Sequence, residues 1–160
     1  IDEIRKRPWR RTAMAPATSK TAVEIEGLEY DWLGRDASGH FALFSTAGAG
    51  YAPPEFLRDT EAHFVAIREV LELPQTTEAR FFPAVAPGLA NEWRFVAERG
   101  LYAYDCDPCG GPYQLVAAPV AVATEDALPP EVVRVATTVR CLMQFERQTV
   151  VTEEMLRARS

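Results

Sequence analysis

The segment that most constrains the fold of this chain runs from Tyr30 to Pro54 and reads YDWLGRDASGHFALFSTAGAGYAPP. Two runs rich in aromatic and aliphatic residues, 30–36 and 40–46, flank the turn sequence DASG at 36–39. Apolar runs on either side of a glycine turn are typical of a β-hairpin. The segment holds no recognisable nucleophile motif, metal-ligand cluster or phosphate-binding loop. We therefore expect a sheet-based binding domain rather than an enzyme.

The rest of the chain adds further strands and several helices. Tyr113 to Val122 is the expected antiparallel partner of Leu101 to Cys106. The best-defined helix follows Pro54, ends at Pro74 and carries an apolar stripe made of Phe56, His63, Phe64, Ile67, Val70 and Leu71. We predict an α+β fold in which an antiparallel meander of about five to six strands packs against one long helix and two or three short helices.

Other patterns are weaker. Val23 to Glu29 alternates aliphatic residues with glutamates, which suits a strand, although a helical start is also compatible. Residues 131–140 are rich in β-branched side chains and suit either a helix or a strand. Gly100 is expected to end a short helix over Glu92 to Glu98 in the left-handed conformation. Residues 142–152 are expected to close the sheet, and residues 153–160 to form a terminal helix.

Length and charge favour one domain with an acidic body. The chain has 160 residues, of which 48% are hydrophobic, and this is enough to bury a core without disulfides. Five basic and two acidic residues give the first thirteen positions a net charge of +3, so the remainder carries −9 of the total of −6. We expect a flexible basic leader over residues 1–20 and a single α+β domain over residues 21–160. Met14 is a candidate for the natural start.

The acidic body bears on partners and location. Carboxylates repel a phosphate backbone, so we expect no nucleic-acid partner, whereas a cationic protein would be attracted. Acidity that serves only solubility is the alternative interpretation. The longest apolar stretch, Leu115 to Ala123, is too short to span a bilayer, and no apolar run follows the basic leader as in a secretory signal. We expect a cytoplasmic location and no membrane association, and the sequence leaves the oligomeric state open.

Three cysteines and two histidines are the residues that could carry metal or redox chemistry. Cys106 and Cys109 have the CxxC spacing of redox pairs and of half zinc sites. Glycines and a proline follow this motif where a redox pair needs a helix, and Cys141, His40 and His63 are distant along the chain. The sequence therefore favours a hairpin loop here. It predicts no metal site and no cofactor, and it places His63 in the core or at its boundary.

Two groups of residues resemble a known family. The first comprises Trp32, Asp36, Gly39, Phe44, Thr46, Gly48 and Pro53. The second comprises Arg99 to Asp105, Tyr113 to Pro119 and Leu128 to Pro129. Together, over Tyr30 to Pro130, they resemble small bacterial immunity proteins, the antitoxins that accompany polymorphic toxins in interbacterial competition, including type VI secretion. The resemblance implies a cytoplasmic toxin inhibitor that binds one cognate toxin and blocks its active site or its access to substrate.

The resemblance also suggests which residues would bind the toxin. Many intracellular toxins act on nucleic acids or nucleotides through cationic clefts, which an inhibitor can fill with carboxylates. The candidates are turn acids and exposed aromatic anchors: Asp31, Asp36, Asp105, Asp107, Trp93, Tyr102, Tyr104 and Tyr113. Two alternatives stay open, an adaptor that binds an extended peptide at a sheet edge near Pro119 and a small hydrolase that reverses a toxin modification.

Overall fold

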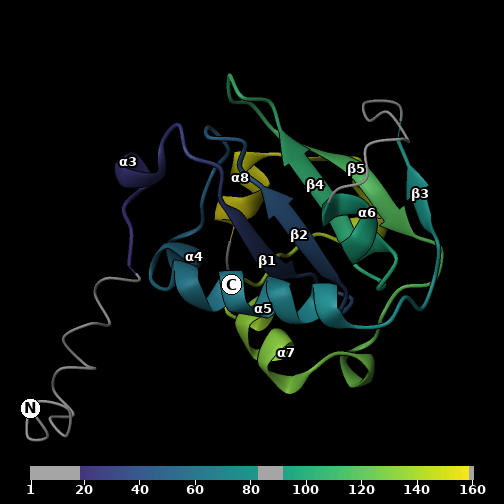
Figure 1. Cartoon of the computed structure of the whole chain (residues 1–160). Coiled ribbons are helices and arrows are strands. Elements are labelled where there is room, and N and C mark those ends of the chain that lie inside the picture. The colour runs from purple at the N-terminus through teal and green to yellow at the C-terminus, as the bar shows by residue number, and fades with distance from the viewer. Residues whose placement is uncertain (1–18, 83–91, 159–160) are drawn as a thin grey trace, which may run out of the picture.

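The computed structural model describes residues 19–82 and 92–158, and these form the α+β fold predicted from the sequence (Figure 1). The strands are β1 (Asp31–Arg35), β2 (Phe41–Ser45), β3 (Ala79–Phe81), β4 (Tyr102–Cys106), β5 (Tyr113–Pro119) and β6 (Val150–Val151). The α-helices are α3 (Ala22–Ile25), α4 (Pro54–Leu57), α5 (Thr60–Glu72), α6 (Glu92–Ala97), α7 (Pro130–Thr137) and α8 (Glu153–Arg157). Two short 3-10 helices are η2 (Glu125–Ala127) and η3 (Phe145–Arg147).

One sheet unites the six described strands in the order β1-β2-β4-β5, with β3 and β6 both paired to the outer edge of β5. The β1–β2 and β4–β5 pairs are antiparallel, as predicted for the two hairpins. β2 and β4 run parallel, so the prediction of a purely antiparallel meander is wrong at this junction. The segment between these two strands contains α4, α5 and α6, and such a crossover returns the chain in the same direction.

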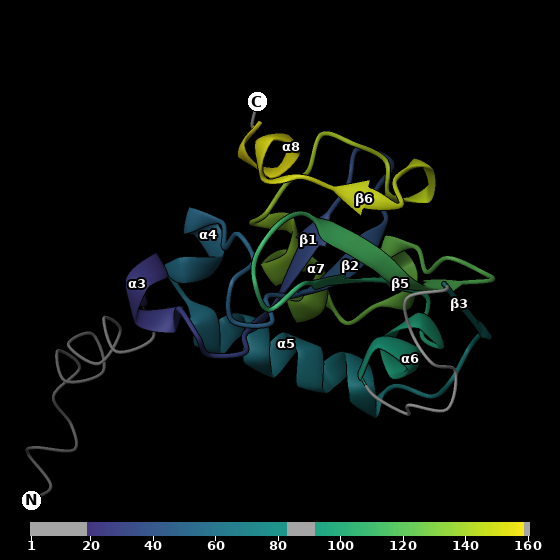
Figure 2. The ribbon, with the colours of Figure 1, turned by 90° about the horizontal axis from the view of Figure 1, so that it is seen from above.

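Each face of the sheet is covered and has its own core. On one face Trp32, Phe44 and Tyr104 stack across β1, β2 and β4, with ring centroids 4.0 and 5.0 Å apart, and Phe145 packs against them. The other face carries Leu33, Leu43 and Ala103 beneath α5, α6 and α7. Figure 2 shows α5 and α6 on one side of the sheet and β6 and α8 on the other. The chain is therefore a layered structure with few sheet positions facing solvent.

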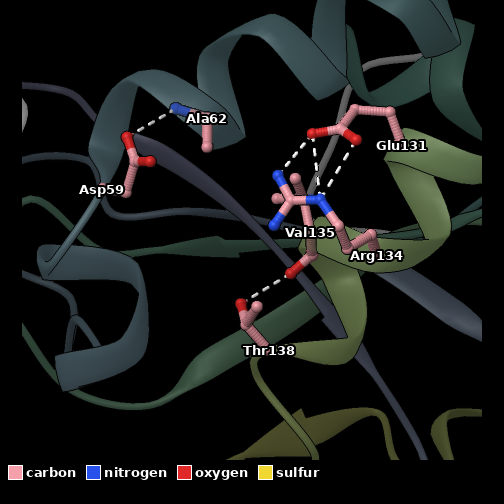
Figure 3. A network of polar contacts seen from close by, with 6 residues as sticks. All are labelled: Asp59, Ala62, Glu131, Arg134, Val135 and Thr138. Atoms are coloured by element: carbon pink, nitrogen blue, oxygen red, sulfur yellow. Dashed lines mark hydrogen bonds and ion pairs between the residues drawn. The ribbon is translucent and has the colours of Figure 1, made fainter. Parts of the chain in front are cut away.

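The predicted single long helix after Pro54 is two helices, α4 and α5. Between them, Asp59 has a φ of −152°, which is not helical, and its carboxylate accepts a hydrogen bond from the N–H of Ala62 at 3.0 Å. An aspartate in this position caps the first turn of the helix that follows. Figure 3 shows this cap together with α7, which packs beside α5 and carries the ion pair between Arg134 and Glu131.

Local capping explains the segments that the sequence left ambiguous. Residues 23–29 do not form a strand, because Thr21 and Glu24 make a reciprocal capping box with N···O distances of 3.2 and 2.8 Å and start α3. Residues 130–137 are the helix α7, with Pro130 in its first turn, where the missing N–H costs nothing. Gly100 follows α6 at a φ of +93°, as predicted.

Part of the predicted leader, residues 1–18, lies outside the described residues, and Met14 lies there too. The division into a leader and one domain stays a prediction. No helix in the described ranges is long and apolar enough to cross a membrane.

Candidate functional site

Three of the predicted aromatic anchors lie in the core. Tyr102, Tyr104 and Tyr113 are only 5%, 0% and 1% exposed. The Tyr104 hydroxyl donates to two main-chain carbonyls of the segment before β6, at 2.8 and 3.2 Å. The Tyr113 hydroxyl donates to the Tyr51 carbonyl at 2.7 Å and accepts from Trp32 Nε1 at 3.2 Å. The prediction that these tyrosines are exposed is therefore wrong, because the C-terminal segment covers their face of the sheet.

We expect Tyr113→Phe to lower the free energy of unfolding by about 1–3 kcal/mol, because it leaves the buried Trp32 indole N–H without its acceptor. Urea denaturation followed by circular dichroism measures this loss. Tyr30→Phe is the matched control, because the Tyr30 ring is only partly buried and we expect a change within about 0.5 kcal/mol. Equal stabilities of the two variants would contradict a structural role for the Tyr113 hydroxyl.

The turn acids differ in what their carboxylates contact. Asp36 is 6% exposed, and its oxygens accept hydrogen bonds from the N–H groups of Ser38, His40 and Phe145 at 2.9, 2.8 and 2.7 Å. Through these bonds Asp36 joins the hairpin turn to the C-terminal segment, so the prediction that it contacts a toxin is not supported. The carboxylate of Asp107 accepts only from the N–H of Cys109, at 2.8 Å, among the contacts of the described residues, and the residue stays exposed.

The CxxC motif forms the hairpin loop expected from the sequence. The N–H of Gly110 donates to the carbonyl of Asp107 at 2.8 Å, and the loop connects the antiparallel strands β4 and β5. Cys106 is buried and Cys109 is exposed. Across the described ranges, no group of three or more histidine, cysteine, aspartate or glutamate residues is arranged to hold a metal ion.

His63 is a core histidine, as expected. Its Nδ1 accepts a hydrogen bond from the N–H of Leu33 at 3.0 Å, and its ring meets that of Phe56 edge to face. Burial lowers the pKa of His63 to about 4, which keeps the ring neutral at physiological pH. The imidazole therefore supports the edge of β1 and is not available to a substrate.

The remaining predicted residues, Asp31, Asp105 and Trp93, come together at one end of the sheet. Asp31 is opposite Ser45 in the β1–β2 pair, and Ser45 is opposite Asp105 in the β2–β4 pair. Residues paired in this way share one face of a sheet, so the three side chains form a polar row under the helices. Trp93 of α6 reaches this row, because its Nε1 donates to Ser45 Oγ at 3.0 Å.

Asp31 also lines a hollow of about 470 Å³ between the start of α5 and the start of α6. We call this hollow the acidic pocket. In the described ranges, its charged lining consists of four carboxylates and two cations: Glu29, Asp31, Glu61, Glu92, Lys20 and Arg68. Phe64 lines it as well and is 57% exposed, so its assignment to the buried stripe of the helix was wrong. The pocket therefore combines excess negative charge with an exposed aromatic side chain.

Burial and neighbouring carboxylates disfavour the ionisation of Asp31 and of the nearby Asp105. Burial, and then the neighbouring Glu92 and Glu29, raise the pKa of Asp31 to about 7, while a hydrogen bond with Ser45 acts in the opposite direction. The pKa of Asp105 is also raised, mainly by burial and further by Glu29 and Asp107. Asp31 therefore retains its proton up to near-neutral pH. A cationic group entering the pocket would offset this repulsion.

A larger hollow, of about 610 Å³, lies beside the loop Gly48–Gly50. Small residues and main chain supply much of its lining, and its cation, Arg157, pairs with Glu153 at 2.9 Å and lies over the ring of Tyr51. Fewer charged residues line this hollow than line the acidic pocket, although its volume is greater.

The sequence did not lead us to identify Ser45, Glu92 or Phe64 as residues of the site. Ser45 is opposite Asp31 in the β1–β2 pair, and this polar pair could have been found by counting outward from the predicted turn. Glu92 is adjacent to the predicted Trp93, but only the packing of α6 brings it to Asp31. Comparison of the chain with protein-family models, curated proteins and solved structures finds no match. The residues and geometry of the acidic pocket are therefore the features that indicate a function.

Proposed function

We propose that this chain is an immunity protein that neutralises a basic toxin in the cytoplasm, and that the acidic pocket provides the main contact. One observation supports this proposal above the others. Among the residues that the structure describes, four carboxylates and two cations line the pocket, beside the exposed ring of Phe64. Acidic surfaces speed association with cationic partners, and an aromatic side chain beside the charges supplies an anchor.

The pocket suits a lysine or arginine side chain of the partner. The cationic head would meet Asp31, Glu92 and Glu29, and the aliphatic stem would pack on Phe64 and Ile67. A toxin that binds phosphates exposes such cations in its active site, because phosphate recognition uses arginine and lysine. Occupation of these cations by carboxylates would exclude the toxin's substrate. On this proposal, the inhibitor has no catalytic activity of its own.

The adaptor alternative requires an unpaired strand edge near Pro119. Pro119 of β5 is already opposite Ala79 of β3. The outer edge of β1 is covered as well, since its N–H groups donate to His63 and to the Val139 carbonyl. Covered edges do not accept an added strand.

A hydrolase is the second candidate, because a carboxyl group with a raised pKa in a pocket is what acid–base catalysis requires. For a hydrolase, Asp31→Asn would abolish turnover. An inhibitor has no turnover, so the same variant would change only its affinity for the toxin.

We expect Glu61→Lys to weaken binding of the toxin by about tenfold or more, because it places a cation at the mouth of a site for cations. Glu154→Lys on α8 is the matched control, because it makes the same change of charge at an exposed position on the opposite side of the sheet. The full chain is used to capture a basic toxin domain from the producing cells. Affinity is then measured by titration calorimetry, and neutralisation by growth of cells that express the toxin domain.

Two results would contradict the proposal. One is that the full chain captures no toxin whose activity it suppresses. The other is that Glu61→Lys and Glu154→Lys bind the toxin equally well, which would place the contact elsewhere on the surface.

A further inference from the structure

The first described residues of the chain lie at the acidic pocket. Ser19 Oγ donates to the Arg58 carbonyl at 3.1 Å, and the N–H of Lys20 donates to the Leu57 carbonyl at 2.8 Å. These two bonds attach residues 19–20 to the junction between α4 and α5. Lys20 also lines the acidic pocket, so a cation that belongs to this part of the chain already lies there. The segment before Lys20 is therefore tethered at the pocket.

The preceding segment has the composition that suits this pocket. Residues 5–11 read RKRPWRR, which is five cations and a tryptophan without an acid. The described lining of the pocket has four carboxylates against two cations, together with the exposed ring of Phe64 and the side chain of Ile67. Arginine stems and the Trp9 indole pack on apolar surface, while the cationic heads meet carboxylates. Both the charge and the apolar character of the segment therefore complement the pocket.

The tether favours binding within one molecule. Arg11 precedes Lys20 by nine positions, which span at most about 30 Å even when fully extended. A short tether gives the segment an effective concentration on the order of millimolar at the pocket. A contact of modest intrinsic affinity is therefore occupied within the chain, without a second molecule.

We propose that residues 5–11 bind in the acidic pocket of the same chain. Their cations contact the three exposed carboxylates of its lining, Glu29, Glu61 and Glu92. A partner that offers lysine or arginine to the pocket must displace this segment, so the segment competes with the partner for the same carboxylates. The contact forms in the isolated chain, so it is present or absent whether or not the proposed toxin exists.

Zero-length crosslinking of the full chain with a carbodiimide tests this contact, because the chain has two lysines, Lys6 and Lys20. The reagent activates a carboxylate, and a lysine amine in contact with it forms an amide as the urea leaves. Lys20 lines the pocket and serves as an internal reference for the reactivity of its carboxylates. We expect mass spectrometry of the digested monomer to find Lys6 joined to Glu29, Glu61 or Glu92. Addition of about 0.5 M NaCl reduces these links, because salt screens exposed charges.

Reversal of two cations in the segment provides the first variant. Arg10→Glu combined with Arg11→Glu keeps Lys6 as the reactive amine. We expect the yield of Lys6 links, relative to Lys20 links, to fall by about fivefold or more, because two attractive charge pairs become repulsive.

Reversal of one charge in the pocket provides the second variant. Glu61→Arg adds no amine, and we expect it to lower the yield of Lys6 links to Glu29 and Glu92. Glu154→Arg on α8 is the matched control, because it makes the same change at an exposed position on the opposite side of the sheet. This control leaves the Lys6 links unchanged.

Three results overturn the contact. The first is that Lys20 forms links in the pocket and Lys6 forms none there, or that Lys6 links spread equally to other faces, such as Glu153 and Glu154 of α8. The second is that Lys6 links join two copies of the chain in a covalent dimer, which makes a neighbouring molecule the occupant of the pocket. The third is an equal loss of links in Glu61→Arg and Glu154→Arg, which makes net charge alone the cause.

Discussion

Asp36→Ala is expected to lower the free energy of unfolding by about 2–4 kcal/mol. Each buried donor left without a partner costs about 1–3 kcal/mol, and water can form hydrogen bonds with some of the donors that lose the carboxylate. The carboxylate accepts from three main-chain N–H groups, at Ser38, His40 and Phe145. The first two belong to the β1–β2 turn, where water can enter. The third is fully buried and joins this turn to a residue 109 positions later in the chain.

The bond from Phe145 explains why the loss extends beyond the turn. Phe145 is fully buried and packs against the rings of Phe44, Tyr102 and Tyr104. Removing the carboxylate loosens the segment that covers the aromatic face of the sheet. Urea denaturation monitored by near-ultraviolet and far-ultraviolet circular dichroism measures both the stability and the packing of these rings.

Asp107→Ala is the matched control. It removes the same side chain from a turn of the same kind, but Asp107 is exposed and its carboxylate accepts only from the N–H of Cys109 among its described contacts. We expect a loss below about 1 kcal/mol. If both variants lose the same stability, the contact between Asp36 and Phe145 contributes nothing beyond the local turn.

The two hairpins were predictable because their signals are local. The turn residues 36–39 and 107–111 sit between apolar runs, and turn chemistry acts over a few residues. The parallel pairing of β2 with β4 was not predictable in this way, because it depends on where the intervening helices pack. The division between α4 and α5 had a local signal in Asp59, but the apolar stripe that continues past it concealed the cap.

The aromatic anchors were mispredicted for a related reason. Alternation of side chains along a strand assigns them to the two faces of the sheet. It identifies exposed side chains only where one face of the sheet is open to solvent. Here Tyr102 and Tyr104 enter one core, and Ala103 between them enters the other. Asp31, Asp105 and Trp93 were identified as candidates from the sequence, but their assembly into one site depended on strand register and on the placement of α6.

The pH dependence of stability provides the second large effect. The pKa of Asp31 is about 7 in the folded protein, against an ordinary value of 3.8. Between these values, the folded protein retains a proton that the unfolded chain has already released. The stabilisation from this proton is complete below about pH 4, falls as pH rises and is lost above about pH 7. We therefore expect the wild-type protein to lose stability across this window.

Asp31→Asn removes this loss, because asparagine carries no proton that titrates in the window. We expect the variant to match the wild-type protein near pH 4 and to exceed it at about pH 8 by as much as about 4 kcal/mol, the linkage value for a shift of about three pKa units.

Urea denaturation of Asp31→Asn, wild type and Glu61→Gln at several pH values between about 4 and 8 provides the measurement, with the range set by the two pKa values of Asp31. Carboxylates distant from the pocket contribute alike to the wild-type protein and to Asp31→Asn, so the difference between their curves reports on Asp31 and its interactions with Glu92 and Glu29. Glu61→Gln should follow the wild-type curve. Parallel curves for Asp31→Asn and wild type would mean that Asp31 ionises in the folded protein without cost.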